Sequence, residues 1–338
     1  MQGPTLRDVA DAAGVHTATA SRALNPSARA LVNPETARRV LRAAEMLGYR
    51  PNPMARGLKT AKSGTVGLVI PDLTNPLFPP IVRGIEVVLD PAGYSTLIVN
   101  TDDRPEREQA QISSLRSRQP EGLIIATALL EHPLLRQLHE QHVPMVLVNR
   151  RTEGLAVGSV TADDATGIGL AVKHLVELGH RRILHLAGPQ TTSTGVERLR
   201  AFRTAAREYA LDDFDRIMVC DKWTEDAGAR ALRMALDSAE NFTAIVAGND
   251  LIALGCYDVF AERNINCPTD ISVTGFNGMP YLDKLSPALT TIAIPHHDIG
   301  RESARMLLET IAEPNHTPRS VLLPPTLVAR ASTAPPRH

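Results

Sequence analysis

Polar side chains and two aromatic side chains follow several of the strands that the sequence predicts, and together they could hold a ligand rich in hydroxyl groups. Arginine and asparagine make paired hydrogen bonds to such groups, and an indole can cover the apolar face of a ring. Because ligands of open parallel sheets bind beyond the carboxyl ends of the strands, these side chains are expected to meet in one cleft. They are Asp72, Asn75 and Phe78 after 65–70, Asn149 and Arg150 at the end of 143–149, Arg198 after 181–188, Trp223 after 216–220, Asn249 after 242–248, and Asn277 after 271–276.

A structural interpretation stands beside this one for several of these residues. Asp72 and Asn75 could cap the helix that follows them, and Asp250, which follows Asn249, is expected to have such a structural role as a helix cap. Trp223 could belong to the core, and Arg198 could form an ion pair at the surface. These alternatives remain open at the level of the sequence.

The sequence shows no group of residues typical of an enzyme. It has neither a phosphate-binding loop nor the nucleophile motif G-x-S-x-G, and Gly167-Ile168-Gly169 lacks the third glycine of a dinucleotide-binding turn. His139 and His142 flank Glu140 at a spacing that differs from that of zinc proteases. We therefore expect a protein that is not an enzyme and that holds neither a metal nor a cofactor.

The segment from residue 63 to 330 alternates buried-strand runs with helical spacers, which predicts parallel sheets flanked by helices. About nine strands over some 270 residues are too many for one sheet of this kind, so we expect two doubly wound lobes. A helix is predicted over 77–89, and two apolar runs come late enough in the chain to cross back between the lobes. The predicted strands are 65–70, 96–100, 122–127, 143–149, 181–188, 216–220, 242–248 and 271–276, with the late runs 289–295 and 321–330.

The first fifty residues predict three short helices. Thr5 and Asp8 form a capping-box pattern, and Gly14 ends the apolar stripe that follows. A second helix is expected from about His16 to Leu24, with its alanines against the first helix and its polar residues free. Such an exposed helix suits insertion into a DNA major groove, although an ordinary helical hairpin would show the same pattern. The third helix begins at Asn33-Pro34, and Gly48 ends it after the stripe Ala37, Val40, Leu41, Ala44 and Leu47.

The distribution of charge supports contact with nucleic acid at one end of the chain. The 338 residues carry a net charge of −1, but residues 1–62 hold ten Lys or Arg and only four Asp or Glu. The three cysteines, Cys220, Cys256 and Cys267, lack metal-like or redox spacing, which fits a reducing cytoplasm. We see no signal peptide and no run of about 20 apolar residues, so we expect a cytoplasmic protein that makes no contact with a membrane.

The motifs TLRDVADAAGV, T-x-x-SRALN, VNPETARRV and LGYRPNPMARGLK, which follow one another from Thr5 to Lys62, resemble the DNA-binding head of the LacI/GalR family of transcription regulators. The resemblance implies a helix-turn-helix headpiece joined to a core like the periplasmic binding proteins. The implied division is a headpiece at 1–50, a hinge helix or linker at 51–62, an N-terminal lobe at 63–163 and 294–323, and a C-terminal lobe at 164–293 and 324–338.

By this resemblance, the headpiece reads DNA and the hinge helix inserts Leu58 into the minor groove as an apolar wedge, with a plain linker as the alternative. Ala18 can offer only a methyl group, so specificity is expected to depend on His16, Thr17, Arg22 and the hinge. The residues expected at DNA are Thr5, Leu6, His16, Thr17, Ala18, Thr19, Ser21, Arg22, Asn25, Asn52, Ala55, Arg56, Leu58 and Lys59.

The resemblance also extends to the ligand cleft. Thr194 and Arg198 match the ligand-binding pair of the motif G-P-x-x-x-x-T-G-x-x-R, and Trp223 matches the aromatic stacker of the family. Two positions depart from the family pattern: Asn277 stands where Asp is common, and Ile294 where sugar-binding members often have a polar residue. The effector is therefore expected to be a sugar or sugar derivative, with a purine or nucleoside as the alternative.

The function predicted from the sequence is that of a homodimeric repressor that binds a pseudo-palindromic operator under the control of a small molecule. A solute-binding protein and an enzyme remain as alternatives from other classes. The basic head and the lack of a signal peptide count against the first, and the lack of catalytic residues counts against the second. The short Pro-rich tail after Ala331 has no heptad pattern, which favours a dimer over a larger assembly.

Overall fold

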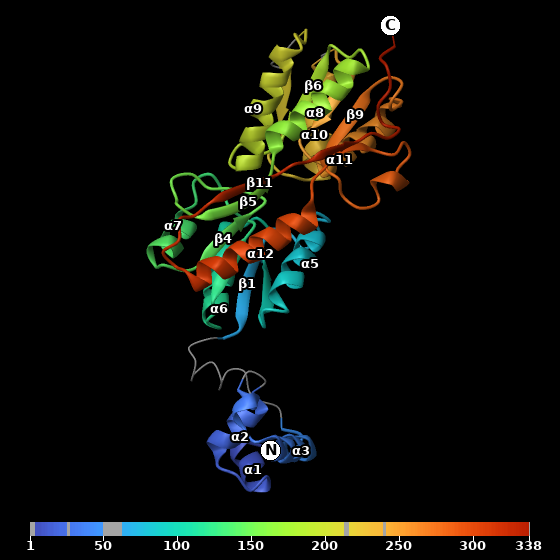
Figure 1. Cartoon of the computed structure of the whole chain (residues 1–338). Helices are drawn as coiled ribbons and strands as arrows, with labels where there is room; N and C mark the ends of the chain where they lie inside the picture. The colour runs from blue at the N-terminus through green and yellow to red at the C-terminus, as the bar shows by residue number, and fades with distance from the viewer. Residues whose placement is uncertain (1–3, 26–27, 50–62, 213–215, 239–240, 338) are drawn as a thin grey trace. The chain divides into compact units, whose positions relative to one another are not determined.

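The chain forms two compact units, Met1–Gly64 and Thr65–His338, which we call the headpiece and the core. A computed structural model describes residues 4–25, 28–49, 63–212, 216–238 and 241–337 (Figure 1). In the described part of the chain, no helix is both long and apolar enough to cross a membrane.

The described residues of the headpiece form three α-helices and one 3-10 turn, and the helix boundaries follow the predicted caps. Thr5 and Asp8 make the capping box, and Asn33 and Gly48 cap the two ends of the third helix. Leu47 departs from the predicted apolar stripe, because it is 40% exposed and Ala43 is buried in its place. The elements are α1 (Leu6–Ala12), α2 (Thr17–Leu24), η1 (Arg29–Leu31) and α3 (Pro34–Leu47).

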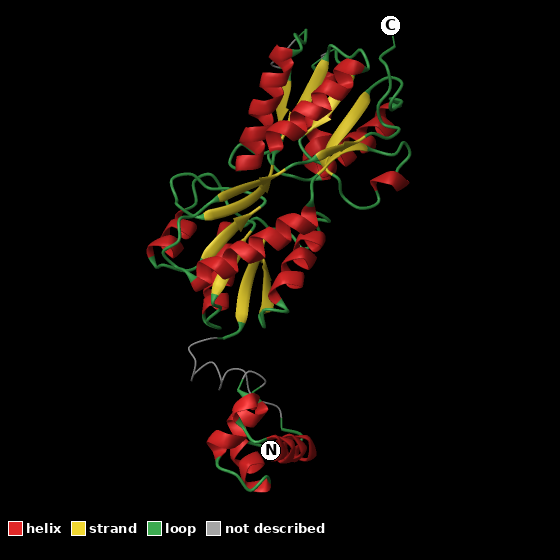
Figure 2. Cartoon of the chain, viewed as in Figure 1, coloured by secondary structure: helices red, strands yellow, loops and turns green. Residues whose placement is uncertain are grey.

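The core contains one sheet in each lobe (Figure 2), and each sheet has six strands. Lobe one holds the sheet with strand order β11-β5-β4-β3-β1-β2, in which every pair is parallel. Its strands are β1 (Thr65–Ile70), β2 (Ser95–Asn100), β3 (Gly122–Ile125), β4 (Met145–Val148), β5 (Gly158–Ala162) and β11 (Ser320–Leu323). The alternation along β1 places Leu68 against one helical layer and Val69 against the other, so the sheet is buried on both faces.

Lobe two holds the sheet with order β12-β10-β9-β8-β6-β7. The prediction of parallel sheets fails at one edge here, because β12 runs antiparallel to β10. The strands are β6 (Ile183–Ala187), β7 (Ile217–Val219), β8 (Ala244–Ala247), β9 (Ser272–Asn277), β10 (Thr290–Ala293) and β12 (Thr326–Val328). The predicted arrangement of two α/β lobes is therefore confirmed, with this one exception in strand direction.

Helices cover both faces of each sheet. In lobe one, α5 and α12 contribute to one hydrophobic cluster, and α6 and α7 contribute to the cluster on the opposite face. In lobe two, α8 and α9 cover one face, and α10 and α11 cover the other. Their bounds are α5 (Phe78–Leu89), α6 (Pro105–Arg116), α7 (Pro133–Glu140), α8 (Asp164–Glu177), α9 (Ser193–Glu208), α10 (Glu225–Asp237), α11 (Asp250–Arg263), η2 (Leu282–Lys284) and α12 (His296–Ala312).

Two predictions about strands were incomplete. The strand β5 was missed, because its sequence GSVTA lacks the large apolar residues by which the other strands were found. The run 321–330 was predicted as one element, but Pro324-Pro325 divides it into β11 and β12, which belong to different sheets. The prolines interrupt the strand because they have no backbone N–H to donate to the hydrogen bonds between neighbouring strands. The chain therefore crosses between the lobes at this point, as the prediction required.

Candidate functional site

Helix α2 presents one side to the headpiece core and the other to solvent. Ala20 and Ala23 are fully buried, whereas Ala18 and Arg22 are exposed. The small buried alanines allow α2 to approach α1 closely, and this leaves a row of polar residues on the outer side. The other residues of α2 and its carboxyl end that were predicted at DNA are half-buried: Thr17, Thr19, Ser21 and Asn25.

Three of the residues predicted at DNA also have a local structural role. His16 is the N-cap of α2, because its Nδ1 accepts a hydrogen bond of 3.2 Å from the backbone N–H of Ala18. The Thr5 hydroxyl takes part in the capping box of α1, and Leu6 packs half-buried against the headpiece core. The ring of His16 therefore keeps only Nε2 free of the cap, and the DNA contacts of all three residues remain predictions.

Two arginines of the basic head serve as caps for helix carboxyl ends. The Nη2 of Arg39 donates to the carbonyl of Ala13 at 3.1 Å, and the Nε of Arg29 donates to the carbonyl of Ala23 at 3.0 Å. Such contacts satisfy carbonyl groups that the ends of helices leave without partners. Part of the positive charge counted in the sequence is thus committed to the fold of the headpiece. The predicted hinge contacts, Asn52, Ala55, Arg56, Leu58 and Lys59, lie outside the described residues.

In the core, the side chains predicted from the carboxyl ends of the strands surround one small compartment between the lobes. Its volume is about 20 Å³, which is close to the room that one water molecule needs. Both lobes contribute to its walls. The lining residues are Asn75, Leu77, Phe78, Asn149, Arg150, Thr194, Arg198, Trp223, Asn249 and Asn277.

Arg198 is held rigidly at the wall of this compartment and is not a surface residue. Its Nε forms a buried ion pair with Asp164 at 2.7 Å, and its Nη1 donates to the carbonyl of Gly248 at 2.7 Å. The guanidinium also lies over the ring of Phe276, 3.8 Å from its centroid, and 5.4 Å from that of Trp223. Such a planar cation, with its rotamer determined by several contacts, is preorganised to receive polar groups of a ligand.

Trp223 closes the compartment from lobe two, where it packs on a glycine. A Cβ added at Gly188 would lie 2.0 Å from the indole, so only glycine leaves room for the ring at this place. The indole is half-buried and faces both the small compartment and the larger cavity described below. The indole also packs against the hydrophobic cluster of lobe two, so Trp223 contacts both the core and the two cavities.

Three polar atoms of this site are buried without a hydrogen-bond partner among the described residues: Nε of Arg150, Nε1 of Trp223 and Oδ1 of Asn277. Buried polar atoms normally have partners, because an unmade hydrogen bond in the interior is costly. Asn277 also has a φ of 119°, a backbone conformation that side chains rarely adopt. Two donors and one acceptor are thus without a partner on residues that line a compartment shared by the two lobes.

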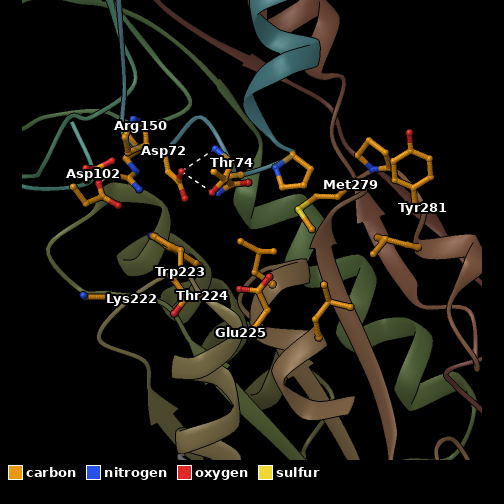
Figure 3. Close-up of a pocket in the computed structure, with 18 of the residues that line it drawn as sticks. Asp72, Thr74, Asp102, Arg150, Lys222, Trp223, Thr224, Glu225, Met279 and Tyr281 are labelled. Atoms are coloured by element: carbon orange, nitrogen blue, oxygen red, sulfur yellow. Dashed lines mark hydrogen bonds and ion pairs between the residues drawn. The ribbon is translucent and has the colours of Figure 1, made fainter. Parts of the chain in front are cut away.

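A second and much larger cavity of about 570 Å³ adjoins the compartment and shares Asn75, Arg150 and Trp223 with it (Figure 3). We call it the main cavity. Its lobe-one side is polar, and Asp72 belongs to this side and not to the small compartment. Its lobe-two side is largely apolar and includes Trp223, Leu251, Leu254, Met279, Pro280, Leu282 and Leu285.

Several lining residues of the main cavity were missed in the sequence. Asp102 and Asp103 follow β2 directly, so the carboxyl-end rule would have found them had it been applied to that strand. Asp103 forms an ion pair with Arg150 at 3.5 Å, and burial lowers the pKa of Arg150 while Asp103 opposes this effect. Lys222, Glu225 and Tyr281 lie in or beside loops, where no periodic pattern marks them.

The predicted capping roles are wrong as stated: neither Asp72 nor Asn75 caps α5, whose N-cap is Leu77, and the N-cap of α11 is Asn249 and not Asp250. Asp72 accepts two bonds from Thr74, at 2.8 Å from the backbone N–H and 2.7 Å from the hydroxyl, and Asn75 accepts one from the N–H of Leu77 at 3.0 Å. Asn249 caps α11 through a 2.8 Å bond from the N–H of Ile252. These side chains shape the loops around the cavities, and their other polar atoms remain for a ligand.

Asp250 is structural, as its neighbourhood shows. It is fully buried, and its two oxygens accept bonds from the Thr291 hydroxyl at 2.5 Å and from the N–H of Met279 at 2.9 Å. Burial raises the pKa of Asp250 to about 7, although these hydrogen bonds act in the opposite direction. The residue holds the loop after β9 that supplies Met279. Ile294, the other departure from the family pattern, is buried in the core, and its N–H donates to the carbonyl of Asn277 at 3.1 Å.

Comparison with known proteins relates both units to one family. Residues 5–52 match the family described as bacterial regulatory proteins, lacI family, and residues 172–333 match the periplasmic binding protein-like domain. The ribose operon repressor of Halalkalibacterium halodurans is 32% identical over 329 residues, which cover 97% of each chain.

The chain belongs to the LacI family. Among solved structures, the Lac repressor dimer bound to operator and the anti-inducer ONPF aligns with a TM-score of 0.88 at 26% identity, covering 98% of this chain and 100% of that one. The complex of the regulator CelR with cellobiose aligns at 0.74 and 31% identity, covering 97% and 99%. This LacI-family chain is therefore a DNA-binding transcriptional regulator and not an enzyme.

Proposed function

We propose that this LacI-family protein is a repressor whose affinity for its operator is controlled by a sugar or sugar derivative bound between the two lobes. The observation that carries this proposal is the group of unpartnered polar atoms on Arg150, Trp223 and Asn277 at a boundary that both lobes share. A ligand that satisfies atoms on both lobes stabilises one degree of lobe closure, and this is how it would affect the DNA-binding unit.

The two sides of the main cavity support a ligand with one polar and one apolar face. Hydroxyl groups would face the carboxylates and Arg150 on lobe one, and the CH groups of a sugar ring would lie against Trp223 on lobe two. A volume of about 570 Å³ lies within the usual range for small-molecule sites and has room for more than one sugar ring. The cellobiose complex of CelR, a relative with the same fold, agrees with this size.

At the DNA end, the proposal assigns base contacts to the outer side of α2 and leads with Arg22, the exposed arginine of that helix. We propose that two copies of the chain act together on a pseudo-palindromic operator, as the Lac repressor is a dimer on its operator. Leu58 and its neighbours in the hinge are proposed to contact the minor groove. The place of action would be the cytoplasm, at the chromosome.

The test uses the purified full chain and a DNA fragment from its own promoter. Because Trp223 is the only tryptophan, its fluorescence can be followed while sugars, disaccharides, polyols and nucleosides are added one at a time. We expect one sugar-like compound to change the emission and to change operator binding over the same concentration range. Operator binding should weaken steeply with salt, as phosphate contacts require.

Two outcomes would contradict the proposal. If the emission responds only to nucleosides, the effector is of the purine or nucleoside class. If a compound changes the emission but leaves operator binding unchanged, the cavity binds a ligand without controlling DNA. An Arg22→Ala variant serves as the matched control, because it should lose operator affinity and keep the fluorescence response.

A further inference from the structure

Direct polar contacts between the two lobes gather on one side of the lobe interface, next to α9. The backbone N–H of Arg151 donates to the Ser193 hydroxyl at 2.8 Å, and the guanidinium of Arg151 forms an ion pair with Glu197. The N–H of Leu130 donates to the carbonyl of Thr191 at 2.9 Å. Arg151 and Leu130 belong to lobe one, and their partners belong to lobe two. We call Arg151, Ser193 and Glu197 the interlobe latch.

The ligand side of the interface differs from the latch side. Among the described residues that line the main cavity and the small compartment, no hydrogen bond or ion pair joins one lobe to the other. The ion pair of Arg198 with Asp164 stays within lobe two, and that of Arg150 with Asp103 stays within lobe one. Around the ligand site, a bound molecule would therefore have to supply the polar connection that the latch supplies on its own side.

Each latch residue is the direct chain neighbour of a residue at the ligand site. Successive residues of an extended segment point to opposite sides, and neighbours on a helix differ by about 100° in direction. On α9, the two latch residues are four positions apart, and so are the two residues that line the ligand site. Residues four apart lie on the same face of a helix, so one face of α9 carries the latch and the adjacent face lines the ligand site. The pairs are Arg151 after Arg150, Ser193 before Thr194, and Glu197 before Arg198.

The latch can open without disturbing a packed core. It borders a cavity of about 240 Å³, whose other walls include Leu147, Leu155, Ser159 of β5 and Ser320 of β11. The side chains of Arg151 and Glu197 are both about one-third exposed, at 35% and 30%. Water can therefore replace the contact when the lobes separate, and the energetic cost of opening stays modest.

We propose that Arg151, Ser193 and Glu197 are positioning residues that hold the lobes together in the absence of effector and so determine how far Arg150 and Arg198 stand apart. The latch sets the balance of open and closed lobes before any ligand binds. Its effect on DNA rests on the proposed function, because only lobe closure connects it to the operator. Its effect on lobe closure does not depend on that proposal.

The experiment measures the accessibility of Trp223, which lies between the lobes, by quenching its fluorescence with the neutral molecule acrylamide. Glu197→Ala should raise the quenching constant, because the lobes separate more often. For a partly exposed ion pair, the open–closed ratio should change by about 1.5- to 5-fold. Operator affinity is then measured on the same samples and should shift by a factor in the same range.

Two further variants make the result specific. Glu262→Ala removes an ion pair of similar exposure, that of Arg233 with Glu262, which lies wholly within lobe two, and it should leave the quenching unchanged. The double variant Arg151→Glu with Glu197→Arg restores opposite charges in reversed order and should recover the wild-type quenching. A merely local role of Glu197 in α9 would not show this recovery.

The outcomes separate the latch from the proposed function. Wild-type quenching in Glu197→Ala, or no recovery in the reversed pair, would overturn the latch. Altered quenching together with unchanged operator affinity would support the latch and would contradict the proposed control of the operator by lobe closure.

Discussion

The headpiece and the core are stabilised by side chains of different size. The described buried residues of the headpiece core are nine, and all of them are Val or Ala. The clusters of the core consist mainly of Leu, Ile and Val and include Phe202 and Phe276. Because hydrophobic stabilisation grows with the buried apolar area, each headpiece residue contributes less, and a small unit also buries a smaller share of its surface. The DNA-binding unit therefore depends on helix caps and close packing, and the sensing unit on a large apolar interior.

The two units also differ in the number of charged side chains that they bury. The core buries the pair Arg198–Asp164 as well as Arg150 and Asp250, whereas the described residues of the headpiece bury no charged side chain. A buried charge is tolerated only where surrounding groups compensate it. The four predictions that follow test this contrast, from the largest expected effect to the smallest.

Phe202→Ala should have the largest effect and should act on the core alone. Phe202 is fully buried and stacks on His185 with ring centroids 4.6 Å apart. Removing a buried ring of this size costs about 3–5 kcal/mol in the free energy of unfolding. Calorimetry should show a lower transition for the core and an unchanged one for the headpiece. A cost below about 1 kcal/mol would contradict the assignment of this ring to the stabilising interior.

The stability of the core should depend on pH through Asp250. Its pKa is about 7 in the folded chain, because it is buried, and about 3.9 in an unfolded chain. Because the folded chain binds this proton more tightly than the unfolded chain, the proton contributes to the free energy of unfolding. This contribution is at most about 4 kcal/mol, is fully present below pH 4 and is lost as the pH rises to 7. Asp250→Asn cannot titrate, so the difference in unfolding free energy between wild type and variant should fall over this range. Parallel curves would contradict the prediction.

Ala20→Leu should disturb the headpiece and spare the core. Ala20 is fully buried where α2 packs on its neighbours, so extra methylene groups have no room there. Overpacking of this kind costs about 1–3 kcal/mol. Operator binding should weaken while the calorimetric transition of the core stays the same. Ala18→Leu, on the exposed side of the same helix, is the matched control for headpiece stability.

Thr5→Ala should have the smallest effect of the four. It removes the hydroxyl of the capping box on α1 and should cost about 1 kcal/mol of headpiece stability. Thr5→Ser keeps the hydroxyl and should remain close to the wild type. Thermal unfolding followed by circular dichroism on the headpiece transition measures both. Equal losses in the two variants would show that the cap contributes little.

Much of the fold could be predicted because it depends on short-range patterns. The caps at Thr5, Asn33 and Gly48 and the strands of the two lobes were found in the sequence, since helix ends and buried strands leave local signals. The strand β5 was missed because its burial comes from its neighbours in the sheet and not from its own apolar residues. The exposure of Leu47 has the same origin, because the stripe extends beyond the part of α3 that other helices cover.

The candidate site divides in a similar way. The sequence determined which side chains stand at the carboxyl ends of strands, because that position follows from strand order along the chain, and nine of the ten residues around the small compartment were named in this way or by family resemblance. The functions of these residues remain proposals. The tertiary structure alone decided that Asp72 faces the main cavity, that Asp102 and Asp103 join it, and that Arg29 and Arg39 cap helices.

The contrast is sharpest between Arg150 and Arg151. Both are arginines that follow β4, and the sequence assigned Arg150 to the ligand site but indicated no role for Arg151. Arg150 lines the ligand site, and Arg151 forms an ion pair with Glu197 in the opposite lobe. The sequence determined by itself the capped helices, the alternation of strands and helices, and the polar residues at strand ends. Which partner each of those residues meets was decided only when distant segments packed together.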